Sequence, residues 1–412
     1  MNVMVNCLDY CLTHSFVPPY VDSTLQFSAW AENCSDSAGS QAHAAGKRGP
    51  DSDFIPITYR VFVRHPWFCD AMTGGLRYTG PMPLPSWHPD SLADRMPFLR
   101  RRALLTQATR AFFAARGYTE VETPYAVPAP GEEVHLRALR TTIHGPDGTG
   151  RALWLHTSPE FAMKRLLAAG AGPVFQLARV WRDGEGSARH AAEFTMLEWY
   201  RPGLPFEGLM DETAALLRAV LPPVVTSGRT ETSLAAFERL TVAEAFLRFA
   251  GADVLGTAGD APGLAQSAGA ALRPDETWED LFFRLLLERV EPHLGRAHPT
   301  FLTHWPAAQA ALARRDPADP RVALRFELFV CGMELANAFE ELTDADEQEA
   351  RFVEDRARRH ALHGPDWPLD EDFLAALRHG MPPSSGIALG FDRLAMLAAG
   401  ADRIGQVLWL PD

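Results

Sequence analysis

The sequence predicts an α+β fold, an antiparallel sheet flanked by helices, on three observations. Strand-like segments dominate residues 118 to 200, helical segments fill about 205 to 295, and strand-like segments return after residue 300. This order lacks the strand–helix alternation that is typical of parallel sheets. Hydrophobic residues make up 47% of the 412-residue chain and charged residues 22%, so a sizeable core can form.

Residues 1–86 differ in composition from the rest of the chain. They contain the small, polar run SDSAGSQAHAAGKRGPDSD and end in the proline-rich PMPLPSWHP. Only ITYRVFV, over 57–63, alternates as a strand would. We expect an irregular, poorly ordered segment over 1–86 and one folded domain over 87–412. A start codon assigned too far upstream would also explain the first segment.

The elements of the folded domain follow from periodicity and from helix-ending residues. A helix is predicted over 98–117, because Leu105, Ala108 and Phe112 share one face and Gly117 suits the position after its end. Pro124 ends a strand over 118–124. Two strands, 174–182 and 193–200, then flank a ten-residue loop.

The second half of the domain is predicted in the same way. Further helices are expected over 206–221, 241–249, 277–294 and 345–360, and strands over 301–304, 325–330, 334–342 and 386–389. The last strand runs into a helix after Gly390.

Charge and cysteine content narrow the classes of function. Lys and Arg number 39 against 52 Asp and Glu, a net charge of −13, which disfavours bulk nucleic-acid binding but leaves room for a local basic patch. No run of 18 apolar residues predicts a membrane span, and the N-terminus does not resemble a signal peptide. Four of the five cysteines precede residue 70, and no CxxC pair predicts zinc. We expect a cytoplasmic protein.

The first candidate site is the hairpin VWRDGEGSARHAAEFTMLEWYR. Arg182 ends one strand, while Glu198 and Tyr200 project to the same face of the next. An Arg that points off a sheet suits phosphate, because its fork matches two phosphate oxygens. A salt-bridged sheet surface is the alternative.

The second candidate site is FELFVCGMELANAFEELTD. A turn between residues 330 and 333 would bring Glu327 beside Glu334, and paired carboxylates with room for phosphate suit Mg²⁺. Asn337, Phe339 and Glu341 then alternate on one face as a cradle for an amine-bearing ligand. The alternative is an acidic, solvated edge.

Two helix starts complete the set. In SGIALGFDRLAML, Gly390 precedes a helix with Arg393 in its first turn, an arrangement that attracts anions but also occurs in surface helices. In TSPEF, Ser158 is predicted as the N-cap and Glu160 lies in the first turn, which is a sufficient structural role in itself.

Together these segments resemble the three motifs of class II aminoacyl-tRNA synthetase catalytic domains, over roughly residues 95 to 410. The helix and strand that end at Pro124 resemble motif 1, Arg182 and its hairpin motif 2, and Gly390 with Arg393 motif 3. The strings TSPE, FTMLEWYRP, ELANAFEELTD and GIALGFDRL resemble the lysyl-tRNA synthetase branch. They most closely resemble the elongation factor P–(R)-β-lysine ligase family, in which the catalytic domain lacks the anticodon-binding OB-fold.

The resemblance implies a role for each candidate residue. The residues that would bind the amino acid, its amines and its aliphatic stem are Ser158, Glu160, Glu198, Tyr200, Asn337, Phe339, Glu341 and Ala388. Arg182 would hold the α-phosphate of ATP and Arg393 would act with it as a catalytic cation. Further ATP contacts would come from Asp183, Glu185, Glu334, Leu335 and Gly390. Glu327 and Glu334 would carry Mg²⁺.

The chain departs from the family pattern at three positions. Gly184 stands where a Glu usually meets the adenine amine, so either Glu185 replaces it or the backbone reads adenine. Ala191 replaces an Asn before the second motif 2 strand, and Ala338 replaces a Gly. None of these removes a charge essential to the chemistry, and we expect an active enzyme.

Ala388 carries a methyl group where lysyl-tRNA synthetases commonly have Gly. On the pocket floor it would shorten the space near an α-amine, and β-lysine carries that amine one carbon further along. The expected reaction is adenylation of β-lysine by ATP, followed by transfer to a lysine of elongation factor P, without a general base in the first step. The alternatives are a lysyl-tRNA synthetase without its anticodon domain and a non-catalytic regulatory paralogue.

The resemblance also bears on partners. Elongation factor P is the expected acceptor, tRNA is not expected, and the motif 1 helix commonly forms a homodimer interface. Leu105, Phe112 and Phe113 could line such an interface or belong to the core, and periodicity does not separate the two.

Overall fold

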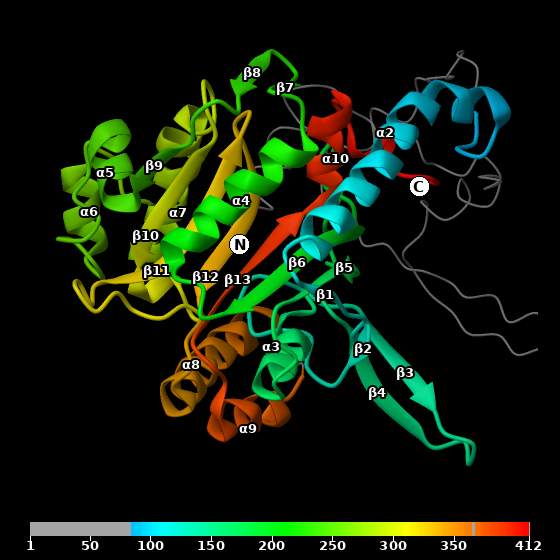
Figure 1. Cartoon of the computed structure of the whole chain (residues 1–412). Coiled ribbons are helices and arrows are strands. Elements are labelled where there is room, and N and C mark those ends of the chain that lie inside the picture. Colours follow the sequence, from blue (N-terminus) through cyan, green and yellow to red (C-terminus); the bar gives the residue numbers. More distant parts are fainter. Residues whose placement is uncertain (1–83, 365–366, 412) are drawn as a thin grey trace, which may run out of the picture. The chain divides into compact units, whose positions relative to one another are not determined.

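An eight-stranded sheet forms the centre of the fold in the computed structural model, which describes residues 84–364 and 367–411 (Figure 1). In spatial order its strands are β1 (Thr119–Glu120), β5 (Val174–Trp181), β6 (Glu193–Pro202), β13 (Ser384–Gly390), β12 (Met333–Glu340), β11 (Val322–Val330), β10 (Thr300–Pro306) and β9 (Glu238–Thr241). Neighbours run antiparallel except β1 with β5 and β9 with β10, which are parallel. The predicted α+β fold is confirmed, and the parallel pairs at the two edges were not predicted.

Helices and short sheets surround this sheet. The α-helices of the described residues are α2 (Pro89–Ala114), α3 (Glu160–Ala168), α4 (Phe206–Val220), α5 (Val242–Ala245), α6 (Ala261–Ser267), α7 (Trp278–Leu285), α8 (Ala345–His363), α9 (Glu371–Gly380) and α10 (Phe391–Ala399). Smaller sheets join β2 (Ala126–Val127), β4 (Gly150–Leu155) and β3 (Arg140–His144), and β7 (Val224–Ser227) with β8 (Thr230–Ser233). None of the helices within the described ranges is long and apolar enough to cross a membrane.

The predicted N-terminal segment falls mainly on residues 1–83, which lie outside the described residues together with the expected strand over 57–63. Residues 84–86 are described and lead into α2, where the backbone N–H of His88 donates to the Pro85 oxygen over 2.9 Å. The residues from Leu84 on form one compact unit. The proposed division at residue 86 otherwise stays a prediction.

Helix α2 begins well before the predicted start at residue 98, and Pro97 lies inside it. A proline there removes one backbone hydrogen bond, which normally weakens a helix. Tertiary contacts compensate, because the Arg95 guanidinium donates to the backbone oxygens of Leu408 and Trp409 over 2.8 and 3.2 Å. The extra turns of α2 therefore depend on contacts with the C-terminal segment. The local sequence does not reveal such contacts.

The helical region was predicted in outline but is more broken than expected. The segments predicted as 241–249 and 277–294 begin as α-helices with capping boxes at Thr241 and Thr277, and each continues as a π-helical turn. Helix α6 and the short strands β7, β8 and β9 were missed. The predicted helices over 206–221 and 345–360 match α4 and α8 closely.

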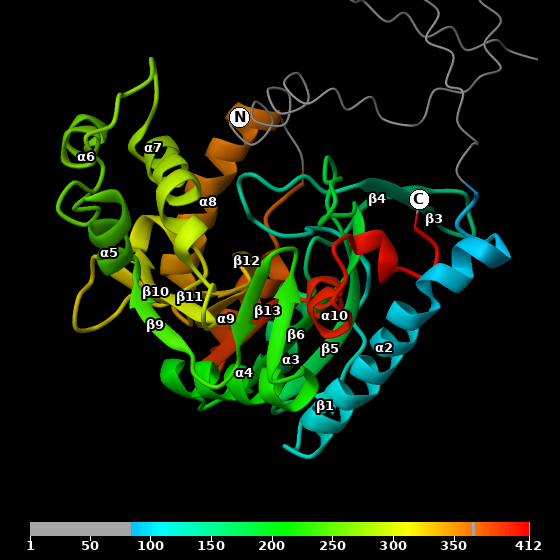
Figure 2. The same ribbon diagram turned by 90° about the horizontal axis from the view of Figure 1, so that it is seen from above.

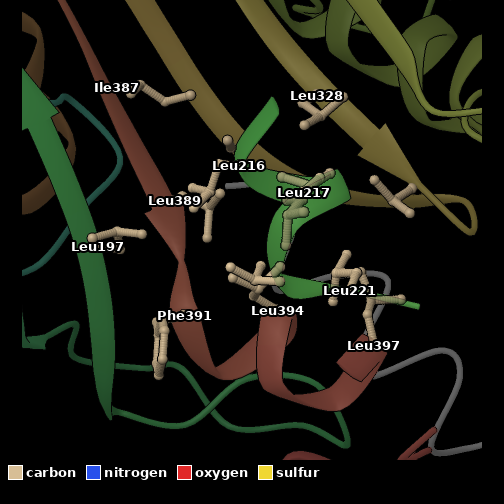
Figure 3. Close-up of a cluster of buried hydrophobic side chains, with 14 of the residues drawn as sticks. Leu197, Leu216, Leu217, Leu221, Leu328, Ile387, Leu389, Phe391, Leu394 and Leu397 are labelled. Carbon is tan, nitrogen blue, oxygen red and sulfur yellow. The ribbon is translucent and has the colours of Figure 1, made fainter. Parts of the chain in front are cut away.

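The main core lies on one face of the sheet. Trp199, Ile387, Ala338 and Phe326 register with one another across β6, β13, β12 and β11, and all four are buried. Helices α2, α4 and α10 cover this face, as both views show (Figures 1 and 2). Leucines of α4 and α10 interdigitate there with Leu197, Leu328 and Leu389 of the strands (Figure 3). Since side chains alternate along a strand, the residues in between face the opposite side.

Three residues of α2 that could line either a dimer interface or the core belong to the core. Leu105, Phe112 and Phe113 are buried within the single chain, with at most 6% of each exposed. They are therefore not free to line an interface between subunits.

Candidate active site

One row of side chains crosses the sheet on the face opposite the main core. Gln176, Glu198, Ala388, Asn337 and Glu327 register with one another on five neighbouring strands, β5, β6, β13, β12 and β11. Four of the five were predicted as site residues from sequence. The fold thus brings residues up to 212 positions apart in the chain onto a single line.

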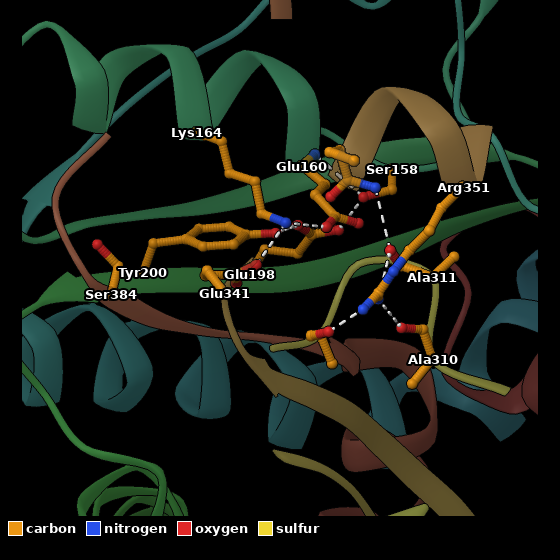
Figure 4. A network of polar contacts seen from close by, with 12 residues as sticks. Ser158, Glu160, Lys164, Glu198, Tyr200, Ala310, Ala311, Glu341, Arg351 and Ser384 are labelled. Carbon is orange, nitrogen blue, oxygen red and sulfur yellow. Dashed lines mark hydrogen bonds and ion pairs between the residues drawn. The ribbon is translucent and has the colours of Figure 1, made fainter. Parts of the chain in front are cut away.

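A buried cluster of acidic and polar side chains, called the pocket below, lies on this face (Figure 4). The Glu198 carboxylate is fully buried and accepts hydrogen bonds from the Ser158 hydroxyl over 2.5 Å and the Tyr200 hydroxyl over 2.7 Å. The Ser158 oxygen also accepts from the backbone N–H of Glu160 over 3.0 Å. Helix α3 begins at Glu160 rather than after a Ser158 N-cap as predicted, so this hydroxyl connects the helix start to the carboxylate.

Lys164 is the cation of this pocket. Its ammonium group lies 2.5 Å from Glu160 Oε1 and pairs with the Glu341 carboxylate, and its side chain is 1% exposed. Glu160, Glu198 and Glu341 therefore share one positive charge. When all three are ionised, the pocket carries two uncompensated negative charges.

Burial changes the acid strength of the pocket residues. Loss of water, followed by the charge of Glu160, raises the pKa of Glu198 to about 8. Burial also raises the pKa of Glu341, although the neighbouring Lys164 opposes the rise. Below a pH of about 8, protonation of Glu198 is therefore favoured, and a bound cation would favour loss of that proton.

Glycine is required at one point on the pocket floor. Gly386 pairs with Tyr200 on β6 and Phe339 on β12. A Cβ atom at Gly386 would collide with the Tyr200 ring and with the Glu341 carboxylate. Any side chain there would displace both groups.

The hairpin between β11 and β12 turns as predicted, at Cys331 and Gly332, whose φ angles are 55° and 69°. A bulge shifts the register, so that Leu328 pairs with Ala336 but Phe329 pairs with Glu334. Simple alternation would place Glu334 and Asn337 on opposite faces, and the extra residue brings Glu334 to the face of Asn337.

Glu327 and Glu334 face each other closely enough to interact. Burial and the charge of Glu334 raise the pKa of Glu327, while Arg325, whose guanidinium lies 2.6 Å from Glu327 Oε1, opposes the rise. Two mutually repelling carboxylates form an oxygen-only donor set, which fits a Mg²⁺ ion that is shared with nucleotide phosphates. No group of three or more potential metal-ligating side chains occurs within the described ranges, so phosphate and water oxygens would complete the shell.

The two arginines that are predicted to bind the nucleotide, Arg182 and Arg393, lie on motif 2 and motif 3. Arg182 directly follows β5, stacks 5.2 Å above the Phe194 ring, and has a buried Nε without a hydrogen-bond partner among the described residues. Arg393 donates to the Glu334 backbone oxygen over 2.6 Å and contacts His190 Nε2 of the motif 2 loop. Gly390 is the N-cap of α10 and offers no side-chain cap, which leaves the N–H groups of the first turn open.

The departures from the family pattern have local explanations. Gly184 has φ 84°, a conformation that a glutamate would adopt only with strain, and the charge of Glu185 acts on His190 within the site. Ala191 packs against the main core. Ala338 faces that core and not the pocket, so its methyl group leaves the candidate site unchanged.

Leu335 is corrected in part. Its side chain is 2% exposed and belongs to the main core, so only its backbone could meet a nucleotide. Asp183 forms an ion pair with Arg137 over 2.7 Å, which fixes the start of the motif 2 loop. The ATP contacts of both residues stay predictions.

Several residues of the site were missed by sequence reasoning. They are Glu133, Lys164, Gln176, His190 and Arg325. Lys164 lies four residues after Glu160, a spacing that is usual for exposed helix pairs and therefore gave no signal. Arg325 precedes Glu327 by two, which places both on one face of a strand and could have been noticed. Gln176 is 1% exposed, and its Nε2 has no hydrogen-bond partner among the described residues.

A separate cleft of about 860 Å³ lies between α7, α8 and the segment after β10. None of the residues predicted as site residues lines it.

Comparison with known proteins agrees with this geometry. Residues 93–412 match the family model described as "tRNA synthetases class II (D, K and N)". Three relatives bear the name "Elongation factor P--(R)-beta-lysine ligase". Those from Edwardsiella ictaluri and Pectobacterium carotovorum are 44% and 43% identical to this chain, each over 78% of it and 96% of their own length. The relative from Proteus mirabilis is 43% identical over 79% of this chain and 97% of its own.

The family model covers the whole of the candidate site, and the matched relatives are covered almost end to end. The chain therefore belongs to the elongation factor P–(R)-β-lysine ligase family of class II synthetase-like, ATP-dependent ligases.

Proposed function

We propose that this enzyme activates (R)-β-lysine with ATP and transfers the β-lysyl group to a lysine side chain of elongation factor P. The observation that carries the proposal is the pocket in which Glu160, Glu198 and Glu341 share the single cation Lys164. Its two uncompensated negative charges match the two ammonium groups of β-lysine. A neutral or acidic amino acid would leave them unbalanced.

In the first step, the substrate carboxylate attacks the α-phosphate of ATP and pyrophosphate leaves. The carboxylate is already nucleophilic, so the protein supplies position and charge rather than a base. Arg182 stabilises the charge that develops on the α-phosphate, and Arg393 holds the remaining phosphates. Glu327 and Glu334 would hold Mg²⁺, which supplies further neutralisation of phosphate charge when bound.

In the second step, a lysine amine of the acceptor attacks the carbonyl carbon of the adenylate and AMP leaves. The amino-acid pocket holds the ammonium groups throughout, so that the carbonyl stays fixed beside Arg182.

The test is ATP–pyrophosphate exchange with α-lysine and (R)-β-lysine, followed by transfer of labelled amino acid to purified elongation factor P or to tRNA. We expect exchange with β-lysine and label on the protein. Label on tRNA would support a lysyl-tRNA synthetase, and absence of any exchange would support a regulatory paralogue.

Replacement of Glu341 by Gln tests the amine pocket. Because a hydrogen bond to a charged group contributes about 1.5–3 kcal/mol, we expect the KM for β-lysine to rise about 10- to 150-fold while the KM for ATP changes little. Glu198→Gln should act in the same direction. Glu340→Gln is the control, since Glu340 pairs with Arg314 outside the pocket. Equal losses for both substrates would contradict the assignment.

The Ala388 methyl group lies between Glu198 and Asn337 in the row across the sheet. We expect Ala388→Gly to raise the kcat/KM for α-lysine relative to β-lysine, because the freed volume accommodates an amine closer to the carboxylate. Exchange assays with both amino acids measure the ratio. An unchanged ratio would remove Ala388 as a determinant of specificity.

Binding of β-lysine should depend on pH. The ammonium groups favour ionised Glu198, whose pKa is about 8 in the empty pocket, so binding below that pH releases a proton. Affinity should therefore rise as the pH increases from 6 toward 8. Calorimetry in two buffers of different ionisation enthalpy measures the proton release, which should shrink in Glu198→Gln.

The remaining parts of the proposal rest on sequence resemblance. They are a homodimer, a cytoplasmic location and an acceptor that is a protein and not tRNA. The net charge of −13 supports the last of these.

A further inference from the structure

The loop between β2 and β3 spans the candidate site and is anchored at its near end. The Thr157 hydroxyl, next to Ser158 of the pocket, donates to the Pro130 oxygen over 3.1 Å. The Trp367 indole N–H donates to the Gly131 oxygen over 2.7 Å. Glu132 follows and forms a buried ion pair with Arg359 of α8, over 2.6 Å.

The far end of the same loop is anchored at motif 2. The Arg137 backbone oxygen accepts a hydrogen bond from Asp183 N–H over 2.8 Å, and the two side chains form the ion pair described above. Residues 133–136 therefore bridge from the amino-acid pocket to the residue after Arg182. A substrate carbonyl that is joined to the α-phosphate would lie beneath this bridge.

Glu133 is the acidic residue of this bridge. Its side chain is exposed, and within the described part of the chain it forms no ion pair or hydrogen bond. The charges that act on it come from both halves of the site: Arg182 most strongly, then Glu160, Arg325 and Glu334. Partial desolvation by the surrounding protein raises the pKa of Glu133, and the charge of Arg182 opposes the rise.

Other carboxylates of the site are engaged. Glu160 and Glu341 pair with Lys164, Glu198 accepts two hydrogen bonds, and Glu327 pairs with Arg325. Glu334 lies 4.0 Å from Arg393. On the loop between the amino-acid pocket and Arg182, Glu133 is the carboxylate without an ion pair or hydrogen bond among the described residues, so it can meet a group that arrives from solvent.

We propose that Glu133 is the catalytic base of the transfer step, receiving the ammonium group of the acceptor lysine and taking its proton. This inference rests on the proposed function. The acceptor R–NH₃⁺ gives one proton to the Glu133 carboxylate, and the free amine attacks the adenylate carbonyl. The bond from the carbonyl carbon to the phosphate oxygen breaks and AMP leaves with the electron pair. The second proton on nitrogen passes to solvent as the amide forms.

The experiment separates the two half-reactions in the full-length enzyme. Glu133→Gln keeps the size and polarity of the side chain but removes the base. We expect ATP–pyrophosphate exchange with β-lysine to stay within about threefold of wild type, since adenylation needs no base. Transfer from preformed β-lysyl adenylate to elongation factor P should slow about 10²-fold, a usual contribution of general-base catalysis.

Hydroxylamine provides the readout that a merely structural role would not give. It is uncharged at neutral pH, so it attacks the adenylate without losing a proton first, and Glu133→Gln should transfer β-lysine to it at the wild-type rate. The control is Glu122→Gln, an exposed glutamate that lies outside the bridge and should change neither half-reaction.

Three outcomes would overturn the inference. Equal loss of exchange and transfer would assign Glu133 to adenylation, and equal loss of transfer to both acceptors would exclude a base. Unchanged transfer to elongation factor P would exclude any role. Absence of exchange in the wild-type enzyme would instead overturn the proposed function, and this inference with it.

Discussion

Replacement of Arg182 by Ala should lower the kcat of ATP–pyrophosphate exchange about 10³-fold, because the α-phosphate loses the cation that meets its developing charge. The guanidinium is already placed for this task. It directly follows β5, stacks over Phe194, and keeps a buried N–H unpaired among the described residues. The KM for ATP should rise less than kcat falls, since the interaction strengthens in the transition state.

Arg182→Lys is the matched variant for this prediction. It keeps the charge but loses the fork that meets two oxygens, so its loss should lie between wild type and Arg182→Ala. The unfolding midpoint of each variant shows whether the fold persists. A loss below tenfold in Arg182→Ala would place the α-phosphate elsewhere.

Lys164→Met should produce the largest loss of stability. It leaves Glu160, Glu198 and Glu341 without an internal cation in a site where Glu198 and Glu341 are at most 1% exposed. Removal of one partner from a buried ion pair commonly costs about 3–5 kcal/mol, and we expect a loss of that size in the free energy of unfolding at pH 8. Urea denaturation measures it. The loss should be smaller at pH 5, where carboxyl groups with raised pKa values are protonated.

The double variant Lys164→Met, Glu341→Gln identifies the cause. If uncompensated charge is responsible, the second change removes one buried carboxylate and restores part of the stability. Additive losses would show instead that Lys164 stabilises the fold through packing of its aliphatic stem.

Much of the fold was predictable because, in these segments, the local sequence pattern and the tertiary contacts favour the same secondary structure. In β6, the segment EFTMLEWYR predicted the strand, and the spacing of two residues predicted the shared face of Glu198 and Tyr200, which the hydrogen bond between their side chains confirms. The turn at Cys331 and Gly332 was likewise predicted, since two chain segments of strand character flank it. The predicted helix over 206–221 matches α4 because its apolar residues pack on the sheet beside α2 and α10.

The unpredicted features depend on contacts between distant segments. The early start of α2 needs the backbone of Leu408 and Trp409, and the parallel edge strands need partners that no local pattern names. Lys164 has the sequence spacing of a surface pair, and only the sheet that covers it makes it the cation of a pocket. For the same reason the register that places Gln176 beside Glu198 could not be predicted.

The bulge at Leu335 sets how the side chains at the two ends of β12 are oriented relative to each other. If β12 paired regularly with β11, Leu335 would lie opposite Phe329, and alternation would turn Glu334 toward the leucine layer. Asn337 and Phe339, beyond the bulge, would keep their orientation. One extra residue in the strand therefore determines whether the two ends of β12 present Glu334 and Asn337 to the same side of the sheet.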